Sequence, residues 1–248
     1  MYKEQAMSRT PFDWSELDKD TLYNILNEAQ QQIVGRKLFI SEIHKILSKQ
    51  VKKYLPISVR MTRDPANDPG LVYIGGGYYS DYDKKYKERY IEIVFSYHMF
   101  DESLTITRYR WVRMCSVFAD TILHELIHLR QYRTRKFKSL PGYESTAHLA
   151  KQRRDQNYYG HPDEVGAYAF NIACELFERF GYDFSRAKQY IDSNQPTQHK
   201  KSTYLRYLTT FDLNHNHKII KKLKKKVMFY LPYAALGKPF KTPDYLTY

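Results

Sequence analysis

Two histidines and a glutamate stand together in the segment HELIH, which runs from His124 to His128. Residues i and i+4 lie on one face of a helix, so His124 and His128 can present two imidazoles to a single metal ion. Glu125 is turned about 100° from His124, which places it beside such an ion rather than on it. Zinc takes imidazole and carboxylate ligands in a tetrahedron, and a catalytic zinc keeps one position for a water that a nearby carboxylate can deprotonate. The segment therefore predicts a hydrolytic zinc site with Glu125 as general base.

The surroundings of this segment bear on that prediction. The HExxH pattern occurs by chance in on the order of one per cent of chains of this size, and the two histidines could simply be hydrogen-bonded core residues. However, residues 117–129 are otherwise almost wholly apolar. Burying three ionisable groups without partners costs several kcal/mol each, and a metal removes that cost. Asp120 lies one turn before His124, where it either orients a ligand or faces solvent or an arginine.

A third ligand must come from elsewhere, because the longer HExxHxxGxxH pattern fails at Gln131 and Thr134. Our preferred residue is Glu164, which lies 36 positions after His128 in the segment GHPDEVGAYAF. A connection of that length can bring a second helix against the first. The alternatives remain His161, His148, or a Glu164 that is there only because acidic residues are favoured in a first helical turn.

The same predicted helix offers supporting groups for Glu164. Tyr168 and Asn171 share its helix face and could hold it in place. The alternative, that acidic residues are simply favoured by the helix dipole in a first turn, would account for Asp163 as well as for Glu164.

HELIH followed by HPDEVGAYAF resembles the gluzincin branch of the zincin metallopeptidases. The run from Glu164 to Ala167, with Ala169 and Phe170 after it, is similar to compact ImmA/IrrE-type domains and to short HExxH proteins of tailed phages. The resemblance covers roughly residues 57–180 and implies that His124, His128 and Glu164 hold zinc. The chain departs from thermolysin-like relatives at Tyr168, where they have an aspartate.

The resemblance also implies that a strand before the active-site helix binds an extended peptide by β-addition. RYIEIVFSY is the first choice for that strand and LVYIGGG the second. A group that stabilises the oxyanion is needed too, and Tyr158, Tyr159 and His161 are the candidates just before Glu164.

The elements that position these residues follow from periodicity. ISVRMT, LVYIGG and RYIEIVFSY, separated by turn signals, predict three strands of one small antiparallel or mixed sheet between residues 57 and 98. A long helix is expected from near 105–110 to near Arg135, buried all round because apolar residues occupy nearly every face. Further helices are expected over 13–53, capped at Asp13 or Ser15 and broken near Gly35, around 144–154, from Pro162 to before Gly181, and near 184–192 and 216–230.

Composition narrows the class of protein. A chain of 248 residues that is 42% apolar can bury a substantial core, and its N-terminus lacks the apolar region of a secretory signal. No apolar run approaches the length of a membrane span, so we expect a soluble protein made in the cytoplasm, or carried in a virion if phage-encoded. Cys115 and Cys174 lie in apolar stretches and are expected to be reduced core residues.

The net charge of +13 suggests a polyanionic partner such as nucleic acid, with a merely solvated basic surface as the alternative. The basic residues cluster at 130–138, in KQRR at 151–154, and in a predicted amphipathic helix over 215–231. His215 and His217 in that last segment could touch a metal, although an exposed HxH is usually incidental.

Together these observations predict an α+β, zincin-like fold: a small sheet packed on a buried HExxH helix and on a second ligand helix. An N-terminal helical segment (1–56), a catalytic core (57–181) and a basic, tyrosine-rich helical extension (182–248) are expected to form one compact unit. The predicted function is that of a zinc metallopeptidase acting on a peptide or protein. The alternatives are a non-catalytic structural or binding protein of this fold, a DNA-associated SprT-like protease, and a zinc hydrolase of a non-peptide amide.

Overall fold

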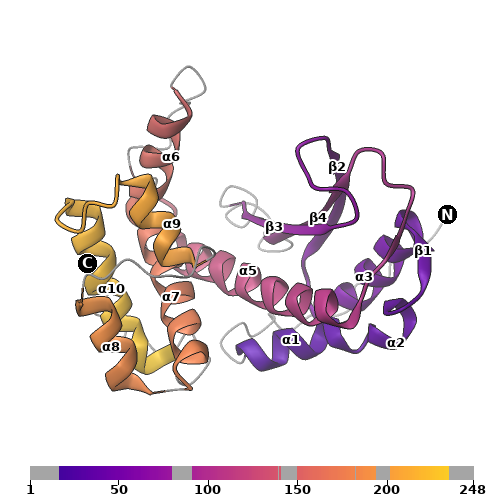
Figure 1. The fold of residues 1–248 in the computed structure, drawn as a ribbon, viewed down its shortest axis with the longest axis horizontal. Coiled ribbons are helices and arrows are strands. Elements are labelled where there is room, and N and C mark those ends of the chain that lie inside the picture. Colours follow the sequence, from indigo (N-terminus) through magenta and orange to yellow (C-terminus); the bar gives the residue numbers. More distant parts are fainter. Residues whose placement is uncertain are drawn as a thin grey trace.

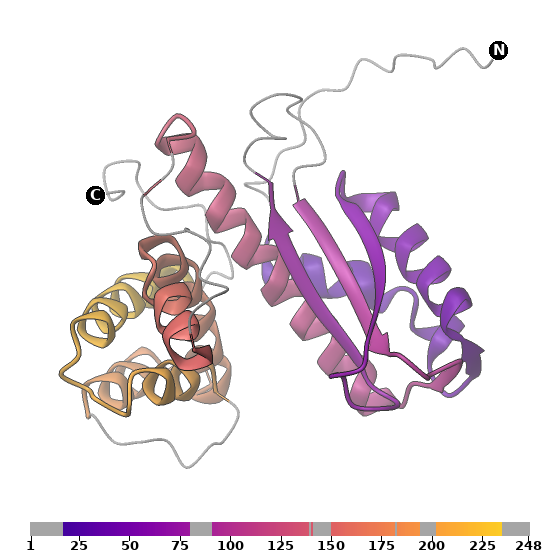
Figure 2. The same ribbon diagram turned by 90° about the horizontal axis from the view of Figure 1, so that it is seen from above.

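The computed structural model describes residues 17–79, 91–138, 140, 150–181, 183–193 and 202–234. One long helix, α5 (Arg108–Thr134), runs through the middle of the molecule (Figure 1). On one side of it lie the strands and the N-terminal helices, and on the other side lie the helices of the C-terminal part (Figures 1 and 2). The class is α+β, as predicted from the sequence.

The N-terminal helices are α1 (Lys19–Asn27), the single turn α2 (Gln30–Ile33) and α3 (Ile40–Tyr54). Asp18 caps α1, its Oδ1 accepting a hydrogen bond from the Thr21 N–H at 2.7 Å, while the predicted caps Asp13 and Ser15 lie outside the described residues. Gly35 ends this first helical stretch in a left-handed conformation with φ of 77°, which confirms the predicted break.

A short two-stranded sheet follows that break and was not expected from the sequence. β1 (Lys37–Phe39) pairs antiparallel with β5 (Ser103–Thr105). The two strands are far apart in the sequence and only three residues long, so neither carries a recognisable alternation.

The three predicted strands form one mixed sheet of order β2-β4-β3. They are β2 (Ser58–Asp64), β3 (Val72–Tyr78) and β4 (Ile91–His98). β4 runs parallel to β2 and antiparallel to β3, and its side chains alternate between buried and half-buried along its whole length. Because β4 is paired on both sides, the prediction that RYIEIVFSY adds a peptide strand is wrong. β3, which contains the second choice LVYIGGG, is an edge strand of this sheet.

α5 begins and ends close to the predicted positions. The Thr107 hydroxyl caps it by accepting a hydrogen bond from the Arg110 N–H at 3.3 Å. Its 27 residues make a rod about 40 Å long. It contacts β3 and β4, α1 and α7, which explains why apolar residues occupy so many of its faces.

The C-terminal part consists of helices alone in the described residues: α6 (Lys151–Gly160), α7 (Pro162–Arg179), α8 (Phe184–Asp192), α9 (Thr203–Thr210) and α10 (Lys218–Ala234). α7, α8 and α10 confirm the predicted helices. The helix expected at 144–154 begins only at Lys151, with 144–149 outside the described residues, and α9 was not expected. Both cysteines are buried and free, as predicted.

The described residues contain no helix with the length and apolar character needed to cross a membrane.

Candidate metal centre

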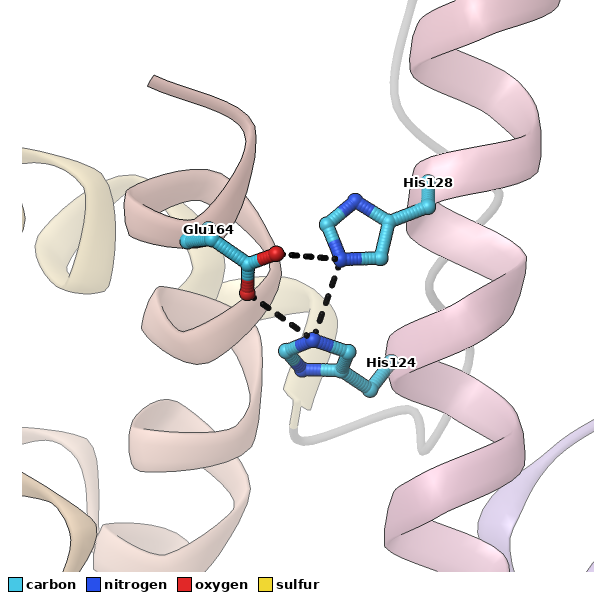
Figure 3. Close-up of side chains that lie close together, drawn as sticks. All are labelled: His124, His128 and Glu164. Carbon is cyan, nitrogen blue, oxygen red and sulfur yellow. Dashed lines mark hydrogen bonds and ion pairs between the residues drawn. The ribbon is translucent and has the colours of Figure 1, made fainter. Parts of the chain in front are cut away.

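The three predicted ligands, His124, His128 and Glu164, lie together between α5 and α7 (Figure 3). The Nε2 atoms of the two histidines are 3.1 Å apart. The Glu164 carboxylate spans both of them, with Oε2 at 3.4 Å from His124 Nε2 and Oε1 at 3.4 Å from His128 Nε2. The side chains are buried, with residue exposures of 7%, 7% and 4% in the same order.

The donor atoms of the three residues lie close enough together for a small cation to contact all of them. The two Nε2 atoms are 3.1 Å apart, and each lies 3.4 Å from a different oxygen of the Glu164 carboxylate. With one donor atom taken from each residue, all three lie within 4.8 Å of one another. The donors are two imidazole nitrogens and one carboxylate, which is a ligand set that zinc accepts. His124, His128 and Glu164 could therefore hold one metal ion between α5 and α7.

The charges at the site favour a bound cation. Burial acts to raise the pKa of Glu164, but its hydrogen bonds with His124 and His128 and their charges lower it well below its usual range. For His128, burial acts to lower the pKa, yet the Glu164 carboxylate raises it overall. The lowered pKa of Glu164 and the raised pKa of His128 both show that the buried carboxylate is stabilised by positive charge next to it.

Local sequence explains how Glu164 reaches the histidines. His161 Nδ1 accepts a hydrogen bond from the Asp163 N–H at 3.2 Å and so caps α7, and Pro162 occupies the first helical position. These two residues fix where α7 starts. Glu164 then lies in the first turn, on the face directed at α5 (Figure 3).

A second group of residues holds His128 in place, and sequence analysis missed its role. Gln131 Oε1 lies 3.0 Å from His128 Nδ1, while Gln131 Nε2 donates to the Asp163 carbonyl at 3.0 Å. Since an amide oxygen can only accept, this contact places the imidazole proton on Nδ1 and directs the Nε2 lone pair at the site. Gly166 makes room, because a Cβ there would lie 2.5 Å from Gln131 Nε2.

Asp163 adds an ion pair to the same contact between α5 and α7. Arg135, just after α5, donates to both of its carboxylate oxygens at 2.6 and 2.8 Å. The buried carboxylate is therefore paired in a two-pronged geometry that is specific in direction. Asp163 is thus not explained by the helix dipole alone.

Glu125 lies next to the triad and under strand β3. The pKa of its carboxyl is raised overall, chiefly by burial and also by the charge of Glu164. The two histidines and a hydrogen bond with the Tyr78 backbone act in the opposite direction. Gly76 allows the close approach of the strand, since a Cβ there would lie 3.0 Å from Glu125 Oε1 and 2.7 Å from Thr121 Cγ2. The Glu125 carboxyl is therefore held between α5 and the edge strand β3.

Tyrosines surround the triad on the α6 and α9 side. The Tyr168 ring lies 4.5 Å from the His124 ring, centroid to centroid. Among the causes that raise the pKa of Tyr158 are burial and hydrogen bonds with Tyr168 and Glu164, so its hydroxyl reaches the ligand carboxylate. Tyr159 instead packs on Tyr207. Of the predicted oxyanion candidates, Tyr158 is the one whose hydroxyl lies at the ligand set.

The remaining candidates have other positions. Asp120 pairs with Lys19 at 2.8 Å rather than with a ligand or an arginine, and Asn171 donates to the Asp120 carbonyl instead of supporting Glu164. His217 Nδ1 accepts from the Ile219 N–H at the start of α10, which gives it a capping role. The rival ligand His161 caps α7.

Two further predictions concern His148 and the basic segments. His148 lies outside the described residues. The basic residues of 130–138 lie at and beyond the end of α5, KQRR forms the first turn of α6, and the exposed lysines of α10 are Lys218, Lys221, Lys222 and Lys225.

Comparison with known proteins found no matching family model, no matching curated protein and no matching solved structure.

Proposed function

We propose that this protein is a zinc-dependent metallopeptidase of zincin-like fold, with His124, His128 and Glu164 as the metal ligands and Glu125 as the general base. The observation that carries the proposal is a buried group of three side chains: two imidazole nitrogens 3.1 Å apart and a carboxylate whose two oxygens each lie 3.4 Å from one of them, with the Glu125 carboxylate nearby. A pair of merely hydrogen-bonded core histidines would not require a third, buried carboxylate at equal distance from both.

The proposed chemistry follows from the residues around the three candidate ligands. A zinc ion held there would polarise a peptide carbonyl and lower the pKa of a water molecule toward neutrality. The Glu125 carboxylate would take the proton from the attacking water and pass it to the leaving amine. Burial raises the pKa of the Glu125 carboxyl in the metal-free protein, which makes its carboxylate a stronger base toward the attacking water.

The edge strand supplies a way to hold the substrate. β3 offers backbone N–H and C=O groups on the side that β4 does not pair, and it lies against α5 at the level of Glu125. An extended peptide that pairs with β3 would run along α5 past the triad. This is how the second predicted strand, LVYIGGG, would serve the reaction.

Zinc analysis and peptide hydrolysis test this proposal. The purified full chain is expected to bind one zinc per molecule, and His124→Ala and Glu164→Gln are expected to lose it. Glu125→Gln should keep the metal and lose activity by about two to four orders of magnitude, the usual contribution of a general base. Glu102→Gln, the same change at an exposed position just before β5, is the matched control.

The outcome also separates the alternatives. A non-catalytic protein of this fold would bind zinc, but it would not hydrolyse peptides, so Glu125→Gln would change no activity. A chain that binds no metal, with a melting temperature that a chelator does not change, would refute the ligand assignment itself. Cleavage only of a non-peptide amide, or only in the presence of DNA, would move the proposal to the corresponding alternative.

A further inference from the structure

A cleft of about 820 Å³ lies between the helices of the C-terminal part and the exposed face of α5. Three cations from three different elements line it: Arg113 from α5, Lys151 from α6 and Arg206 from α9. In Figures 1 and 2, α6 and α9 lie on one side of α5 and the sheet lies on the other. The volume is within the range of sites that enclose a small ligand or part of a chain.

Two observations relate the position of the cleft to that of the metal centre. Arg113 precedes His124 by eleven residues, and eleven steps of about 100° bring it back to nearly the same face of α5, three turns away. Arg206 hydrogen-bonds Tyr159, and its neighbour Tyr207 packs against Tyr168, the ring that lies on His124. The cleft and the triad therefore both adjoin α5, about three helical turns apart, and packed aromatic side chains link α9 to His124.

The charge of the cleft is positive. Arg113, Lys151 and Arg206 contribute three positive charges and Asp155 one negative charge, a balance of +2. Among the described residues, none of the three cations forms an ion pair within 4 Å. Several cations that converge on a recess raise the local concentration of anionic groups there.

We infer that this cleft binds acidic side chains of the substrate, so that the protein acts on acidic segments of peptides or proteins. The inference rests on the proposed function, because it treats the cleft as part of the path to the metal. A peptide fits better than a nucleic acid, because the lining of the cleft also includes Asp155 and neutral hydrogen-bonding side chains such as Ser202 and Thr209. A phosphate backbone would meet a repulsive carboxylate there, whereas a peptide offers N–H groups as well as charges.

Binding to a protein that cannot turn over tests the inference separately from catalysis. We would use the zinc-loaded Glu125→Gln chain and measure fluorescence anisotropy with three labelled peptides of equal length, rich in Glu, Gln or Lys. The Glu peptide is expected to bind about tenfold more tightly than the Gln peptide at low salt, with the difference shrinking as salt is added. A labelled single-stranded oligonucleotide is the fourth probe.

Charge reversal then locates the binding. Lys151→Glu and Arg206→Glu should each remove most of the preference for the Glu peptide. Lys151 is exposed in the first turn of α6, where an acidic residue suits the helix dipole, so this variant should fold normally. Lys221→Glu makes the same charge change on the exposed face of α10, outside the cleft, and should leave binding within about twofold of the parent.

Three results would overturn the inference: equal binding of the Glu and Gln peptides, an equal loss in Lys221→Glu, or tighter binding of the oligonucleotide that Lys151→Glu abolishes. Failure of the proposed function has a different signature. In that case the Glu peptide binds as expected, but the zinc-loaded wild type does not hydrolyse it.

Discussion

Removing the Gln131 side chain should weaken metal binding without touching a ligand. In Gln131→Leu, His128 Nδ1 loses its partner at 3.0 Å and the buried Asp163 carbonyl loses its donor at 3.0 Å. Loss of a hydrogen bond that orients a ligand histidine reduces metal affinity about 10- to 100-fold, which corresponds to about 1.4–2.7 kcal/mol. Two lost hydrogen bonds, at about 0.5–1.5 kcal/mol each, lower the free energy of unfolding of the metal-free chain by about 1–3 kcal/mol.

The assay is a zinc titration in competition with a chromophoric chelator, followed by urea unfolding of the metal-free chain. Gln50→Leu is the control, because Gln50 also donates two hydrogen bonds, to the Ile25 carbonyl at 2.8 Å and to Glu28 at 2.9 Å, but far from the site. The control should lose stability and keep zinc affinity.

A second substitution at the same position separates the two roles. Gln131→Glu retains an acceptor for His128 Nδ1 but cannot donate to the Asp163 carbonyl, so it should keep zinc affinity and still lose stability. If Gln131→Leu binds zinc as tightly as the wild type, His128 is not oriented by Gln131 and the reasoning is refuted.

Three further results are expected. Gly76→Ala should lower kcat/KM at least about tenfold at unchanged zinc content, since its Cβ would press on Glu125, while Gly75→Ala, with nothing within 4 Å of its Cβ, should have little effect on activity. A chelator should lower the melting temperature of the wild type but not that of His124→Ala, because only the folded wild type gains stability from the metal. Burial raises the pKa of Glu175, so the folded state binds that proton more tightly than the unfolded chain, and the free energy of unfolding falls as pH rises from about 4 through the raised pKa. In urea unfolding, the free energy of unfolding of Glu175→Gln should therefore increase relative to that of the wild type between about pH 4 and pH 7.

The parts of the fold that could be predicted are those with local signals. α5 and α7 are bounded by side-chain caps, by Pro162 and by the glycine at 181, all of which are visible in the sequence. The three strands of the main sheet stand between clear turn residues. Local signals also place Glu164 in the first turn of α7, because a helix that starts with a proline fixes which residues lie in its first turn.

The parts that could not be predicted depend on contacts between distant segments. The order of the strands is one example. RYIEIVFSY was chosen as the binding strand because it precedes the active-site helix, but β4 is the central strand of the sheet. The short pair β1 and β5 is another, since its register depends on residues more than sixty positions apart. Neither can be decided from composition.

Gln131 shows the same limit at the level of the site. Its identity excludes the three-histidine pattern, because that pattern needs a glycine at this position so that the chain can leave the helix. The structure shows the consequence: α5 continues as a helix through Thr134, which keeps Gln131 one turn after His128 and within reach of Nδ1. The amide then needs an acceptor for its N–H, and the Asp163 carbonyl, one residue before the third ligand, provides it. A helix that does not break after its second histidine must obtain its third ligand from another segment, and Gln131 ties that segment to the histidine it supports.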